Sequence, residues 1–238
     1  MGATMLTDKL RTLFQRNGGD QFGAPNVQGY RTQLPGSLSR HAQAPAAPVT
    51  RASRGVEQFF FSLRGTVGLT ILDLAIPNQD NINHLTNMGH KLYTADLIGS
   101  LDEAFGHDPD EQTNAGRIEY FLRSSLDYPA GTFDGVLLWD SLQFMGPALL
   151  TATIARLHEV MRPDAYLLAF VTSNDKATDV PAHSFRIIDN KNILITERGL
   201  RASGQVFNNR NIEKLFGNFQ SVKFFLTRES LREIIVRR

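Results

Sequence analysis

Two acidic residues stand at the ends of short apolar runs in the first half of the chain. Asp73 lies in the run LTILDL, and Asp96 follows the run KLYT, 23 residues after Asp73. A carboxylate just beyond the C-terminal end of a parallel strand lies at the crevice where open α/β sheets bind ligands. Alternatively, Asp73 satisfies backbone N–H groups at the start of the next helix. Both acids are therefore candidates for binding a polar ligand, and Asp96 is the clearer one.

Three further candidates follow later apolar runs. Trp139 and Asp140 end the run FDGVLLWD, and we expect them at the same edge of the sheet, where they would line a substrate pocket. The alternative is that Trp139 caps the core and Asp140 caps the following helix. His183 precedes a predicted hairpin that would cover this pocket, which makes it a candidate general base.

Several kinds of site lack their motifs. The six histidines show no paired metal-ligand spacing and the chain has no cysteine, so we expect no metal site. The sequence also contains no G-x-G-x-x-G, no G-x-x-x-x-G-K-[ST] and no G-x-S-x-G. These absences argue against dinucleotide oxidoreductases, nucleoside triphosphatases and serine hydrolases.

The segments that must position these candidates alternate between strand and helix after Val56. Continuous apolar runs at 69–74 and 165–171 are typical of strands covered on both faces, and we expect a further strand within RIEYFLR. The C-terminal part is different, because it predicts a hairpin turning at 190–192, a short helix and a final strand pair. The pattern predicts a Rossmann-like, doubly wound α/β sheet that is mostly parallel, with a C-terminal antiparallel pair.

Residues 1–55 have another character. Residues 5–16 place apolar side chains at helical spacing, and the Gly, Pro, Gln and Ser that follow as far as Gly55 indicate a flexible linker. This arm carries a net charge of +5, so it is either a solvated tail or a contact for an acidic protein, anionic lipid or nucleic acid. We expect one domain at 56–238. Without a long apolar run or a secretory signal, we expect a cytoplasmic protein.

The order of these motifs resembles that of class I S-adenosylmethionine (SAM) dependent methyltransferases. The segment TILDLAIPNQDNINHLTNMGHKLYTADL is similar to their first motif, and FDGVLLWD followed by ARLHEVMRPDAYLLAFV is similar to their fourth and fifth strands. The resemblance covers residues 56–238. It implies SAM as cofactor and a role for Asp96 in holding the ribose hydroxyls. The cofactor contacts that it implies are Asp73, Ala75, Asn78, Asp96 and Leu97.

The cofactor turn departs from the family pattern. Ala75, Pro77 and Gln79 stand where the family carries glycines. A glycine lets a ligand approach the main chain closely, whereas proline removes an N–H donor. Two functions therefore stay open. One is methyl transfer from SAM to a small-molecule or protein acceptor, which needs positioning more than a dedicated base. The other is a pseudo-methyltransferase that serves as a binding or scaffold module.

Overall fold

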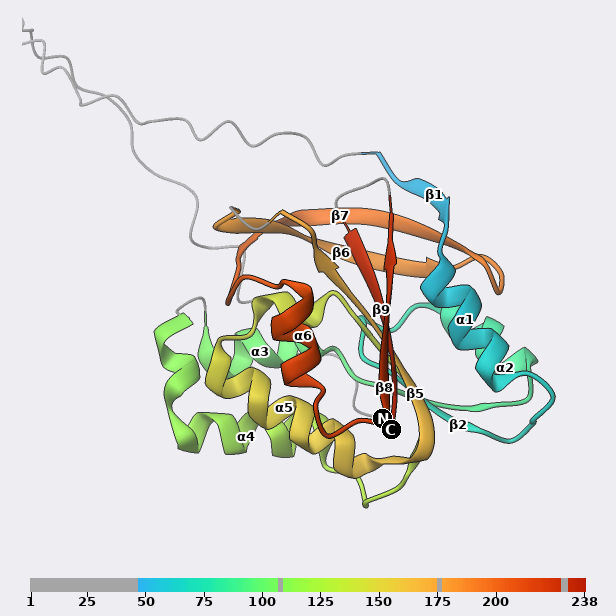
Figure 1. Cartoon of the computed structure of the whole chain (residues 1–238), viewed down its shortest axis with the longest axis horizontal. Coiled ribbons are helices and arrows are strands. Elements are labelled where there is room, and N and C mark those ends of the chain that lie inside the picture. Colours follow the sequence, from blue (N-terminus) through green and yellow to red (C-terminus); the bar gives the residue numbers. More distant parts are fainter. Residues whose placement is uncertain (1–46, 107–108, 175–176, 228–230) are drawn as a thin grey trace, which may run out of the picture. The chain divides into compact units, whose positions relative to one another are not determined.

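The computed structural model describes residues 47–106, 109–174, 177–227 and 231–238 (Figure 1). The helix expected over residues 5–16 lies outside these residues. The helices are α1 (Arg54–Leu63), α2 (Gln79–Asn87), α3 (Leu97–Phe105), α4 (Ala115–Leu126), α5 (Pro147–Val160) and α6 (Asn209–Leu215), with 3-10 turns η1 (Pro109–Thr113) and η2 (Ser141–Phe144). The strands are β1 (Val49–Ala52), β2 (Thr70–Asp73), β3 (Lys91–Thr94), β4 (Phe133–Trp139), β5 (Met161–Thr172), β6 (Asp179–Ile187), β7 (Asn192–Ala202), β8 (Ser221–Leu226) and β9 (Leu231–Arg237).

Six of the strands form the main sheet, in the order β3-β2-β4-β5-β9-β8. The strands β3, β2, β4 and β5 are parallel to one another, and β9 runs antiparallel to both β5 and β8. The predicted fold is confirmed: a mostly parallel Rossmann-like sheet that ends in a C-terminal antiparallel pair.

Helices cover both faces of this sheet, as its doubly wound pattern requires. Adjacent residues of each central strand enter different hydrophobic clusters. Ile71 packs with α1 and α2, whereas Leu72 packs with α3, α4 and α5; on β5, Leu168 and Leu167 divide in the same way. Because both faces are covered, these strands are continuously apolar rather than alternating. This pattern made them recognisable in the sequence.

The segment RIEYFLR is helical, so the strand expected there was wrong. It lies in α4, which begins after Asn114, whose side chain accepts the amide N–H of Arg117. Phe121 and Ser125 are buried one helical turn apart. Among the described residues, β3 consequently pairs with β2 alone and forms one edge of the main sheet.

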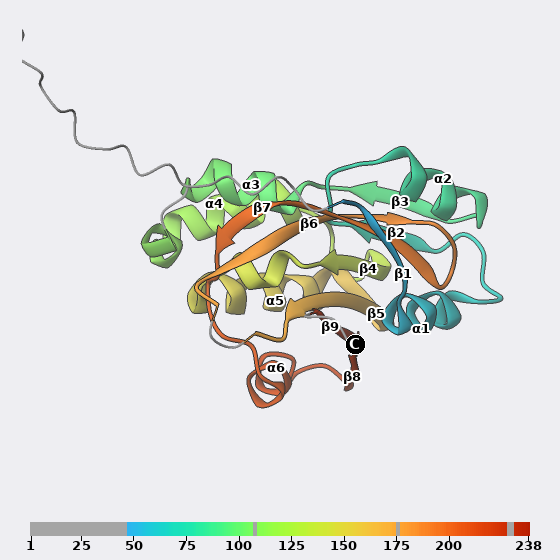
Figure 2. The same ribbon diagram turned by 90° about the horizontal axis from the view of Figure 1, so that it is seen from above.

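A second sheet, in the order β1-β7-β6, is built on the predicted hairpin, and Figures 1 and 2 show it lying across one end of the main sheet. Its strand β1 lies inside the segment expected to be a linker as far as Gly55. Residues 49–52 are therefore part of the folded domain and not of a linker. The sequence pattern did not indicate this strand because its pairing partners are far away along the chain. Thr50, for example, pairs with Leu194.

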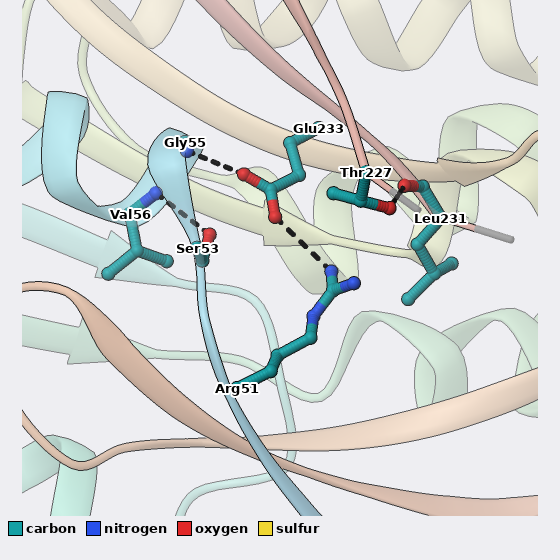
Figure 3. A network of polar contacts seen from close by, with 7 residues as sticks. All are labelled: Arg51, Ser53, Gly55, Val56, Thr227, Leu231 and Glu233. Carbon is teal, nitrogen blue, oxygen red and sulfur yellow. Dashed lines mark hydrogen bonds and ion pairs between the residues drawn. The ribbon is translucent and has the colours of Figure 1, made fainter. Parts of the chain in front are cut away.

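A buried ion pair joins β1 to β9 of the main sheet (Figure 3). The guanidinium of Arg51 lies 3.2 Å from Glu233 Oε1, and Glu233 Oε2 accepts the amide N–H of Gly55 at 2.6 Å. Ser53 caps α1 by accepting the N–H of Val56. A Cβ on Gly55 would meet the Leu168 side chain at 2.8 Å, so only glycine permits this close approach of α1 to β5 and β9.

None of the helices within the described residues combines the length and the apolar character needed to cross a membrane. In the same part of the chain, no group of three or more His, Asp and Glu side chains is arranged to hold a metal ion.

Candidate functional site

A pocket of 280 Å³ lies where the strands β2, β3 and β4 end, beneath the β6–β7 hairpin. Its floor comes from the turns after the parallel strands, and its other wall comes from the hairpin. Of the residues expected at the site, five line it: Ala75, Asp96, Trp139, Asp140 and His183. The position agrees with the rule that open α/β sheets bind ligands at the carboxyl ends of their strands.

Asp73 is sealed beneath this pocket. Its Oδ1 accepts the indole N–H of Trp139 at 2.6 Å and the amide N–H of Ala75 at 3.2 Å, and its Oδ2 accepts the side-chain N–H of Asn81 at 2.9 Å. Burial raises the pKa of the Asp73 carboxyl, and the three donors lower it in part. With 1% of the residue exposed, Asp73 organises the turn from within and does not reach a ligand.

The turn after β2 is held by the hairpin. Asn78 caps α2 by accepting the N–H of Asn81, and its own amide donates to the carbonyl of Phe185 at 3.3 Å. Asn81 adds two contacts to β6, one to the Phe185 carbonyl and one from the Ile187 amide at 2.8 Å. Asn78, expected among the cofactor contacts, therefore joins the turn to β6 and does not line the pocket.

Asp96 and Leu97 differ although they are neighbours. Asp96 caps α3 by accepting the N–H of Gly99 at 3.0 Å, and it lines the pocket while half-buried. The absence of a side chain at Gly99 leaves room for the Asp96 carboxylate, because a Cβ there would lie 2.7 Å from Asp96 Oδ2. The side chain of Leu97 is fully buried in the core, which leaves only its backbone near the pocket.

Trp139 turns toward Asp73 through an unusual backbone conformation. Its φ is 55°, in the left-handed region that bulky residues rarely adopt. Two contacts of the indole stabilise this conformation. Its N–H donates to Asp73, and its ring stacks on Phe185 with centroids 4.8 Å apart and planes at 7°. Trp139 is 1% exposed and packs in the core, and it also lies in the lining of the pocket.

Asp140 and His183 form a pair that also lines the pocket. Asp140 Oδ2 accepts the backbone N–H of His183 at 2.9 Å, and it also lies 2.9 Å from the ring Nδ1 of His183. Burial raises the pKa of the Asp140 carboxyl, while the His183 contacts lower it. Asp140 makes no cap bond to η2, so its partner is the hairpin rather than the helix.

Three residues of the site were missed in the sequence. Phe185 stacks on Trp139, and Arg201 on β7 makes a two-pronged ion pair with Asp102 on α3 above the pocket. Arg201 also lies over the ring of Phe144. No local pattern marks these residues, because each acts on a partner far away along the chain.

Comparisons with known proteins give fold similarity only. No protein-family model matches the chain, and no curated protein matches it. A SAM-dependent methyltransferase from Archaeoglobus fulgidus is 12% identical, with a TM-score of 0.47 over 77% of this chain and 91% of that one. The 1,6-didemethyltoxoflavin-N1-methyltransferase from Burkholderia thailandensis, solved with S-adenosylhomocysteine, is 15% identical, with a TM-score of 0.43 over 78% and 77%.

A SAM-dependent methyltransferase from Methanosarcina mazei is 12% identical, with a TM-score of 0.45 over 75% of this chain and 96% of that one. Both the identities and the TM-scores are low, so the activity has to be argued from the site. In the order of its sequence motifs and in its doubly wound sheet with a C-terminal antiparallel pair, the chain resembles the class I SAM-dependent methyltransferases.

Proposed function

We propose that the chain is a methyltransferase-like protein that binds SAM in the pocket beneath the β6–β7 hairpin and transfers its methyl group to an acceptor. The observation that carries this proposal is Asp96. Its carboxylate follows β3 and lines the pocket, and only one of its oxygens is used by the Gly99 amide in the contacts of the described residues. Such a carboxylate accepts hydrogen bonds from a pair of ribose hydroxyls.

The dimensions of the pocket predict weak binding. Its 280 Å³ lies just below the range of about 300 to 1,000 Å³ that is usual for ligand sites. The side chains of Ala75 and Ile76 border the pocket on the side of the β2 turn, and Phe185 borders it on the side of the hairpin. SAM would bind only after the hairpin shifts, and the free energy of that shift reduces the affinity.

Calorimetric titration with SAM and with S-adenosylhomocysteine tests the proposal. We expect binding by the wild type, and about tenfold weaker binding by Asp96→Asn, since a charge-assisted hydrogen bond contributes roughly 1.5 kcal/mol or more. Asp127→Asn, an exposed carboxylate beyond the end of α4, is the matched control and should bind as the wild type does. No heat with either ligand at millimolar concentration would refute the proposal.

One observation favours a second function, that of a scaffold without catalysis. The Trp139–Phe185 stack and the Asp140–His183 pair join the hairpin to the sheet through buried contacts, and these contacts hold the hairpin against the sheet. In this function the hairpin is permanently shut, and the basic arm of residues 1–55 binds an acidic protein, anionic lipid or nucleic acid. Binding of SAM in the titration decides against this function.

A further inference from the structure

An extra residue in β7 places Arg198 beside the pocket beneath the β6–β7 hairpin. In the ladder between the two strands, His183 pairs with Glu197. The next pair joins Ala182 to Gly199, so Arg198 is inserted between two paired residues. Such a bulge re-aims a side chain and is common next to active sites. Arg198 lines the pocket, and this irregularity of β7 therefore supplies the pocket with a cation.

The other charged groups that the hairpin contributes to this pocket already have partners. Arg201 forms an ion pair with Asp102, and His183 lies against Asp140. Arg198, in contrast, is exposed, and its guanidinium makes no hydrogen bond or ion pair within the described residues. Of the two arginines that line the pocket, Arg198 is therefore the one that is available to a ligand.

The mouth of the pocket also carries apolar side chains. Leu200 of β7 and Ile76 of the turn after β2 both line the pocket, and 66% and 38% of these two residues are exposed. Ligand sites combine apolar walls with a few polar groups that fix the orientation of the ligand. An exposed cation beside exposed apolar side chains suits a ligand that has an apolar body and an anionic group.

We propose that the mouth of this pocket binds the methyl acceptor, that the acceptor is a small organic acid with an apolar body, and that Arg198 holds its carboxylate. This inference rests on the proposed function, in which SAM occupies the pocket itself. A single guanidinium matches a single carboxylate, because it donates two parallel N–H bonds to the two oxygens. A phosphate monoester carries more charge and calls for further donors, and Arg201 is already engaged by its ion pair.

The acidic side chains of the pocket are compatible with this role. Asp102 is balanced by its ion pair with β7, and Asp140 is buried and accepts a hydrogen bond from β6. Asp96 is the acid that the ribose hydroxyls of SAM would occupy. With these carboxylates engaged, the exposed Arg198 is the charge that an anion meets at the mouth.

Two other roles for Arg198 are distinguishable from this one. If Arg198 binds the carboxylate of SAM itself, its substitution weakens cofactor binding. If Arg198 is only a solvated surface cation, its substitution changes the binding of neither molecule. Separate titrations of the cofactor product and of an organic acid therefore decide among the three roles.

The test uses the full chain, calorimetric titration and two probes, octanoate and the neutral octanamide, in the presence of saturating S-adenosylhomocysteine. We expect the wild type to bind octanoate about tenfold more tightly than octanamide or better, since hydrogen bonds between charged groups are the strong ones. Arg198→Gln should bind the two probes equally, and Arg198→Lys should keep part of the preference. Both variants should bind S-adenosylhomocysteine as the wild type does. The matched control is Arg210→Gln, an exposed arginine on α6 outside this pocket, which should keep the full preference.

Methyl resonances locate the probe independently of its affinity. Octanoate should shift the methyl signals of Ile76 and Leu200, which border the mouth. Binding of S-adenosylhomocysteine without a preference for octanoate, or an equal preference in Arg198→Gln, would overturn this inference and leave the proposed function standing. Loss of S-adenosylhomocysteine binding in Arg198→Gln would make Arg198 a cofactor contact and would also overturn it. No binding of SAM or S-adenosylhomocysteine by the wild type would overturn both proposals.

Discussion

The ends of β2 and β3 lie side by side in the main sheet, and each is followed by chain that leads to a helix beneath the same hairpin. Asp73 at the end of β2 is buried and receives three donors, whereas Asp96 beyond β3 stays half-buried and lines the pocket. The difference comes from β6, which is joined to the β2 turn through Asn78 and Asn81. The position of a carboxylate in a sheet therefore does not decide whether a ligand reaches it.

The largest expected effect is a loss of stability at the end of β2, where Asp73 is buried. Asp73→Ala leaves the indole N–H of Trp139, the amide of Asn81 and the backbone N–H of Ala75 without their acceptor. Each orphaned donor costs about 1 to 3 kcal/mol, so for the three donors we expect a loss of about 3 to 9 kcal/mol in the free energy of unfolding, measured with urea. A loss below that of the Asp96→Ala variant would contradict the comparison.

Phe185→Ala removes the ring that stacks on Trp139. Truncation of a buried Phe costs about 3 to 5 kcal/mol, and we expect about 3 because the hairpin keeps its contacts through Asn78 and Asn81. Trp139 is the only tryptophan and stacks on Phe185, so its fluorescence reports the opening directly by a shift to longer wavelength. An unchanged emission maximum would show that Phe185 does not shield Trp139 from solvent.

Stability at the end of β2 should also depend on pH. Burial raises the pKa of Asp73, so the native state holds this proton more tightly than the unfolded chain does. The contribution of Asp73 to stability is fully present below its unfolded pKa of 3.8 and is lost as the pH rises through the folded value. Urea midpoints from acid to neutral pH should therefore fall more in the wild type than in Asp73→Asn. Parallel curves for the two proteins would show that Asp73 does not titrate differently on folding.

The smallest expected effect on stability is at the end of β3, where Asp96 lines the pocket. Asp96→Ala removes the N-cap of α3 and should cost about 1 kcal/mol, the usual value for a cap. Urea denaturation of this variant, beside Asp73→Ala, gives the ratio of the two effects. A cost above about 3 kcal/mol would mean that Asp96 is as structural as Asp73, and it would weaken the ribose-binding role.

Much of the fold was predictable because its information is local. The apolar runs of β2, β4 and β5 are continuous, as strands covered on both faces must be, and the turn at 190–192 lies between two β-rich segments. These features predicted the parallel sheet, the hairpin and the C-terminal pair. They also predicted the edge where Asp96, Trp139, Asp140 and His183 meet, because parallel strands present their carboxyl ends on one side.

Local pattern failed where distant contacts decide. The segment RIEYFLR suits a strand or a helix equally well, and it became helical where its apolar side packs against α3 and α5. The strand β1 exists only beside β7, which lies about 140 residues later. Asp73 accepts hydrogen bonds from Trp139 and Asn81. Asn81 is in turn held by the amide of Ile187 on β6. The sequence alone determined the parallel strands β2, β3, β4 and β5 and the edge where their ends meet, since burial and periodicity are local properties of these segments. Only the tertiary structure decided which of those ends stays open, because the hairpin that closes one of them comes from more than a hundred residues further along the chain.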